Sequence, residues 1–327
     1  MTSASVTTPR KPSPERTGSD RVGVVRRRLA VATVTVCLPY TLLKALWVSG
    51  VSVGASAEGF TDTTRAANLV TGGMDLVAMI LAIAFVAPWG RRLPAFLVAF
   101  PLWIGSGLLA PVAVGFLVGT PLQLATGGGN PFTGDDVLSP WVFGLVYSGF
   151  VLQAVLLVPG FLLYARTRWP VATGGGRVAD GEGDTGPLQR ILGSFLVVAA
   201  MAFAGVQLSG AVQSGGSSAG PSLPQRTLFT ASALAAVAAA VGTTGLVRGK
   251  RLTRARLATV WLGSGVIFTT ALSETLRNVS TEPGHWAAPG AGPGERTTVL
   301  LILLMSLGGA IGGALRLVEE ERAHPTS

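Results

Sequence analysis

The sequence predicts an all-α integral membrane protein with eight transmembrane helices, and three observations lead to this prediction. The chain of 327 residues is apolar, with 49% hydrophobic residues and a mean hydropathy of +0.53. Only 13% of the residues are charged, whereas soluble domains have about 25%. Lysine and arginine still outnumber aspartate and glutamate by 25 to 16, and these cations cluster between the apolar segments.

Eight segments satisfy the requirement of about 20 mostly apolar residues for a helix that crosses the hydrocarbon core. They comprise residues 29–48, 66–87, 94–119, 141–164, 191–208, 228–247, 257–276 and 298–315. Their apolar runs are continuous and do not alternate with a period of two, which favours helices over the strands of a membrane β-barrel. Pro101 and Pro111 lie inside the third segment and predict a kink there.

The distribution of lysine and arginine predicts the topology. Twenty of the 25 cations lie in the two terminal regions and in the second, fourth and sixth loops. The alternate loops hold only four, namely Arg65, Arg226, Arg277 and Arg296. Because cytoplasmic loops carry the excess of these residues, we expect both termini in the cytoplasm and the protein in the plasma membrane. The clusters border the apolar segments, which indicates contact with anionic lipid at the cytoplasmic face and not with nucleic acid.

A Trp-x-Gly-Ser-Gly motif occurs in the third and again in the seventh segment, 158 residues later. The copies comprise Trp103, Gly105, Ser106 and Gly107, and Trp261, Gly263, Ser264 and Gly265. Two further matches, 90–93 with 249–252 and 49–50 with 209–210, have nearly the same offset. We interpret them as an internal repeat of a four-helix unit. An even number of segments per unit predicts parallel repeats, and the small residues predict close helix packing.

The repeat divides the chain into five regions. We expect a disordered basic cytoplasmic tail at 1–28, a first four-helix unit at 29–165, a cytoplasmic linker at 166–190, a second four-helix unit at 191–315 and a cytoplasmic tail at 316–327.

A few polar residues lie inside the predicted membrane segments, where they need a reason to be present. At 1.5 Å per residue, Lys44 lies about 6 Å and Asp75 about 13 Å below the outer helix ends, so a lysine side chain could bridge the difference. Asn68 and Thr71 share one helix face with Asp75. The candidate intramembrane polar site comprises Lys44, Asp75, Asn68, Thr71, Tyr147 and Glu274.

Other interpretations of these residues stay open at this point. The Lys44 side chain could extend to the outer interface beside Trp47, and Glu274 could be solvated at its helix end. At the repeat offset, Lys44 corresponds to Ala204 and Glu274 to Phe116. A site built from these charges would therefore be asymmetric.

Several chemistries lack the residues that they need. The two histidines, His285 and His324, lie outside the apolar segments, and Cys37 is the only cysteine. No glycine-rich loop is followed by Lys-Ser or Lys-Thr. We expect no metal site, no cofactor and no enzymatic activity. Transport or permeation of a small solute or ion is the leading hypothesis, and a non-catalytic membrane scaffold or partner-binding subunit is the alternative.

One stretch of the first segment has a familiar pattern, with Leu38, Pro39 and Tyr40 followed by Leu43, Lys44 and Trp47. It resembles a pattern in uncharacterised multi-pass membrane proteins of actinobacteria. The resemblance covers mainly the first half of the chain. It implies a membrane helix bundle and carries no activity.

The topology predicts which loops a membrane-impermeant thiol reagent reaches on intact cells. After replacement of Cys37 by serine, a single cysteine in loop 248–256 should react only once the membrane is permeabilised. A cysteine in loop 212–224 should react without permeabilisation. Labelling of loop 248–256 on intact cells would overturn the orientation.

Overall fold

The computed structural model describes residues 14–56, 62–131, 138–168, 185–213, 220–248, 253–279 and 293–323. Eight helices in these ranges are long and apolar enough to cross a membrane, which confirms the predicted number and order of segments. The described residues form no strand, and an isolated bridge between Ala55 and Leu138 is the only β-type pairing among them.

The helices fall into two groups that follow the order of the chain. The first half contains α1 (Pro14–Val48), α2 (Asp62–Ala84), α3 (Ala95–Val114) and α5 (Pro140–Arg168), and the second half contains α7 (Gly186–Val212), α8 (Leu223–Val247), α9 (Arg254–Val279) and α10 (Pro293–Ala323). Three short elements complete the first half: the 3₁₀ turn η2 (Pro88–Arg92), the π-helical turn η3 (Gly115–Gly119) and α4 (Thr120–Ala125).

Two elements differ from the sequence-based expectation. The α1 helix already begins at Pro14, so the described part of the tail 1–28 is helical, while residues 1–13 lie outside the described residues. The α3 helix continues through Pro101 and Pro111, and its irregularity follows them as the π turn η3. Of the predicted linker 166–190, residues 169–184 lie outside the described part of the chain.

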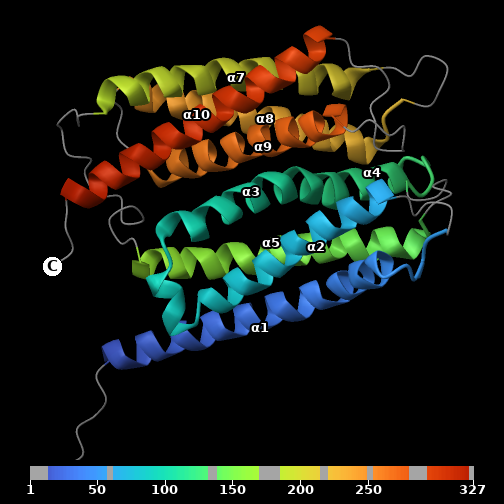
Figure 1. Ribbon diagram of the computed structural model, residues 1–327, viewed down its shortest axis with the longest axis horizontal. Helices are drawn as coiled ribbons and strands as arrows, with labels where there is room; N and C mark the ends of the chain where they lie inside the picture. Colours follow the sequence, from blue (N-terminus) through green and yellow to red (C-terminus); the bar gives the residue numbers. More distant parts are fainter. Residues whose placement is uncertain are drawn as a thin grey trace, which may run out of the picture.

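The two halves lie side by side, with α3 and α9 at their junction (Figure 1). In the first half α1 packs against α2 and α5, and in the second half α7 packs in the same way against α8 and α10. The α1 helix begins and α10 ends at the same end of the bundle (Figure 1), as an even number of crossings requires.

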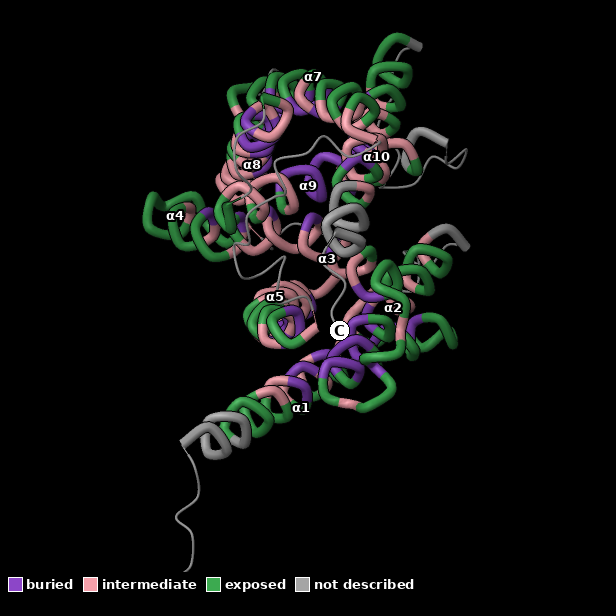
Figure 2. Tube along the Cα trace, turned by 90° about the vertical axis from the view of Figure 1, so that its left-hand side faces the viewer, coloured by how far each residue is buried: buried purple, intermediate pink, exposed green. Residues whose placement is uncertain are grey.

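The two halves differ in how completely they are packed. In the second half, residues from α7, α8, α9 and α10 form one hydrophobic cluster that includes Ala204 and Ala236. The first half has two separate clusters, one around Phe85 and one around Trp47. Figure 2 shows buried positions on the inner faces of α8 and α9 and also where α1 meets α2, whereas α4 lies at the periphery and is exposed.

The two Trp-x-Gly-Ser-Gly motifs contact each other reciprocally at the junction. The Trp103 indole Nε1 donates a hydrogen bond to Ser264 Oγ at 3.1 Å, and the Trp261 indole Nε1 donates to Ser106 Oγ at 3.2 Å. Between them the helix backbones approach so closely that a Cβ atom added at Gly265 would lie 2.8 Å from the Trp103 carbonyl oxygen. Glycine is therefore required at this position of the interface.

A matched pair of substitutions tests the α3–α9 contact. A Cβ atom at Gly107 would fall on the Gly265 carbonyl, whereas none of the described atoms beyond its own helix lies within 4 Å of one at Gly105. We expect Gly107→Ala to lower stability in detergent by about 1–3 kcal/mol, as overpacking does. Gly105→Ala should change it by less than about 1 kcal/mol. Equal thermal unfolding temperatures for both variants would contradict the close contact.

Candidate functional site

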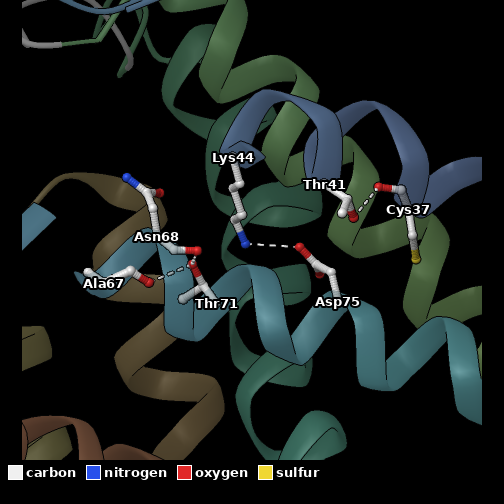
Figure 3. A network of polar contacts seen from close by, with 7 residues as sticks. All are labelled: Cys37, Thr41, Lys44, Ala67, Asn68, Thr71 and Asp75. Carbon is white, nitrogen blue, oxygen red and sulfur yellow. Dashed lines mark hydrogen bonds and ion pairs between the residues drawn. The ribbon is translucent and has the colours of Figure 1, made fainter. Parts of the chain in front are cut away.

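Lys44 and Asp75 form an ion pair inside the membrane-spanning part of the first half. The Lys44 Nζ donates to Asp75 Oδ2 at 2.9 Å, and the two side chains are only 3% and 7% exposed. Figure 3 shows Lys44 projecting from α1 across to Asp75 on α2. The depths of the two residues along their helices made this pair possible, and the structure contains it.

The surroundings of Lys44 determine where its amino group lies. Its aliphatic stem lies over Gly72, where an added Cβ atom would be 3.5 Å from the lysine Cδ, and its Nζ continues to Asp75 one turn further along α2. The Nζ also lies 3.8 Å from the centre of the Tyr40 ring, a cation–π geometry. The amino group therefore points away from the Trp47 end of α1, which excludes the interpretation in which it extends to that interface.

Apolar side chains pack around the C-terminal end of α1, near Trp47. Leu43, Trp47 and Val142 form a small buried cluster, and Tyr40 packs against it. The Trp47 indole donates to the Val53 carbonyl at 2.8 Å, which holds the chain after α1 over this cluster. Gly54 supports the same loop with a φ of +69°, a conformation that suits glycine. The end of α1 that follows Lys44 is thus covered by side chains and by the loop.

The other predicted site residues make contacts of their own. Thr71 is exposed and donates its hydroxyl to the Ala67 carbonyl of its own helix at 2.8 Å. Asn68 lies on α2 beyond Thr71 and points away from Asp75 (Figure 3). Tyr147 stacks between Phe116 and Phe143, with ring centres 5.6 and 6.3 Å away.

Glu274 lies apart from the ion pair. It belongs to α9 in the second half, which packs against α3, α8 and α10, whereas the pair joins α1 and α2. The candidate site is therefore reduced to Lys44 and Asp75, with Tyr40 and Gly72 added by the structure. The sequence contained a signal for both additions, because Tyr40 precedes Lys44 by one helical turn and Gly72 precedes Asp75 by one turn.

The corresponding place in the second half contains no charge. The buried positions of α2 from Asp75 to Ala84 recur in α8 from Ala236 to Gly245, 161 residues later. At the offset of 160 residues between α1 and α7, Lys44 corresponds to Ala204. Ala204 and Ala236 are 3% and 0% exposed and belong to the same hydrophobic cluster. At these matched positions the second half has two buried alanines where the first half has an ion pair.

The chemistry of the pair is that of an isolated, desolvated lysine and carboxylate. A group of three or more His, Cys, Asp or Glu side chains that could hold a metal ion is absent from the described part of the chain. No family model, curated protein or solved structure matches the chain. The assignment of a function therefore depends on the geometry alone.

A double-mutant cycle tests the energetic role of the ion pair. We expect Lys44→Met alone to lower stability in detergent by about 3–5 kcal/mol, because it leaves the buried Asp75 carboxylate unpaired. The variant Lys44→Met/Asp75→Leu should return close to wild type, since the second half packs the same position with apolar residues. A double variant that is less stable than both single variants would show that the fold requires the charges.

Proposed function

We propose that this protein is a multi-pass membrane protein that transports or conducts a small solute or ion, with Lys44 and Asp75 at its site. One observation supports the proposal above the others: a desolvated ion pair occupies a place that the second half fills with Ala204 and Ala236. A buried ion pair is often no more stabilising than apolar residues of similar volume. Ionisable residues inside membrane spans commonly mark pathways for solutes, ions or protons.

The architecture of the proposed transporter is a duplicated four-helix unit with parallel halves. The reciprocal Trp103–Ser264 and Trp261–Ser106 hydrogen bonds support this, because a two-fold axis along the membrane normal would generate such a pair. The arginine distribution supports cytoplasmic termini, contact with anionic lipid and a plasma-membrane location. The pattern around Lys44 supports a kinship with multi-pass membrane proteins of actinobacteria.

A second candidate is a non-catalytic membrane scaffold or partner-binding subunit. In this reading the 2.9 Å contact between Lys44 and Asp75 only fastens α1 to α2. Neither candidate assigns an enzymatic activity to the protein. The two candidates differ in whether a solute interacts with the pair.

Purified wild-type protein and the Lys44→Met/Asp75→Leu variant separate the two candidates. Thermal unfolding is measured with sodium, potassium, chloride, phosphate, acetate and a set of amino acids as probes. We expect at least one probe to raise the unfolding temperature of the wild type by several degrees and to leave the variant unchanged. If no probe shifts the wild type, or if the same probe shifts both proteins equally, the site proposal is wrong and the scaffold remains.

A further inference from the structure

The first glycine of the Trp-x-Gly-Ser-Gly motif, Gly105 in the first half and Gly263 in the second, has different surroundings in the two halves. In the second half, a Cβ atom at Gly263 would lie 2.6 Å from the Ala239 Cβ and still closer to the Ala235 carbonyl, so α9 lies directly on α8. Gly105 is its counterpart 158 residues earlier, and a Cβ atom added there would have no described atom from another helix within 4 Å. The close packing predicted for this glycine is therefore absent from the first half.

The helix that would cover Gly105 is α2. At the offset of 161 residues, Ala235 and Ala239 of α8 correspond to Met74 and Ala78 of α2. Met74 directly precedes Asp75, so the uncovered seam between α2 and α3 lies beside the ion pair. The helix packing agrees with an open seam, because α2 packs against α3 far less extensively than α8 packs against α9.

The seam is closed at one end only. Towards η2, Ala78, Leu81 and Phe85 share a hydrophobic cluster with Val98 of α3. The η2 turn itself is fixed by α5, since the Gly90 carbonyl accepts hydrogen bonds from Tyr164 Oη at 2.8 Å and from Arg168 at 3.2 Å. The η2 end therefore joins α2 to α3 and provides a pivot for movement between them.

We propose that the seam between α2 and α3 is a gate beside the ion pair, and that the structure has it open. In the closed arrangement Met74 packs on Gly105, as Ala235 packs on Gly263. The Lys44–Asp75 pair holds α2 to α1 through a different face of α2 from the one that carries Met74. Weakening the pair frees α2 to close on α3. What the gate serves depends on the proposed function, but its closure does not.

Cysteine cross-linking in native membranes tests the closure without any solute. In a Cys37→Ser background, Met74→Cys/Gly105→Cys is oxidised with copper phenanthroline, and the free thiols are counted by a gel-shift reagent. We expect a disulfide to form at least several-fold faster than in Ile80→Cys/Gly105→Cys, because Ile80 is 54% exposed on the outer side of α2. Leu192→Cys/Gly312→Cys serves as the positive control, since its β-carbons would lie 3.2 Å apart.

The outcomes decide both parts of the proposal. If the Met74–Gly105 pair reacts no faster than the Ile80 control while the Leu192–Gly312 pair is oxidised, the seam does not close and the gate is wrong. Addition of Asp75→Asn should accelerate the Met74–Gly105 disulfide several-fold. An unchanged rate would overturn the role of the ion pair in holding the gate open. Solute-dependent thermal shifts that persist in either case would leave the proposed function standing without the gate.

Discussion

The close approach of the α3 and α9 backbones is the contact on which the arrangement of the two halves depends. Within a bilayer, apolar side chains gain little by facing each other instead of lipid, so helix association relies on tight packing and on hydrogen bonds. Gly107 and Gly265 provide the packing, and the two tryptophan–serine pairs provide the hydrogen bonds. The junction of the halves thus uses one motif twice.

Commitment of α3 to this junction has a cost for the first half. In the second half α9 contacts α3 and at the same time packs on α8 through Gly263, which completes a closed four-helix cluster. In the first half α3 keeps its contact with α9 but leaves Gly105 uncovered. The α2 helix then packs mainly against α1, and Lys44–Asp75 is a major polar contact between them. The ion pair therefore lies in the more loosely packed half.

The sequence predicted the features that the bilayer itself imposes. Hydropathy predicts eight apolar segments, because each segment must satisfy its own backbone hydrogen bonds in the bilayer. An even number of segments places both chain ends at the same end of the bundle, and the spacing of the motifs reveals the matched pair. The partner of Lys44 could also be named, since depth along a helix follows from residue number. The close helix packing predicted at Gly105 is absent, because a pattern of small residues shows where helices can approach and not whether a neighbouring helix is there.

The sequence could not predict which residues of other helices lie next to Lys44 and Asp75. Tyr147 and Glu274 had suitable depth, but depth leaves rotation and neighbours undefined. In the structure Tyr147 stacks on Phe116, and Glu274 belongs to α9, which packs against α3, α8 and α10. Tyr40 and Gly72 enter the site because they lie one turn from the two charges, so a search by helix face would have found them.

A comparison of the two halves supplies a criterion that neither half offers alone. If Lys44 and Asp75 were needed to pack the helices, the second half would need equivalent charges, and it has Ala204 and Ala236. If the small residues of α3 were needed only for its contact with α9, Gly105 would have no reason to match Gly263, because a Cβ atom added at Gly105 would meet no described atom of another helix within 4 Å. A moving α2 helix explains both features. Gly105 is used in the arrangement in which α2 packs on α3, and the Lys44–Asp75 pair stabilises the other arrangement.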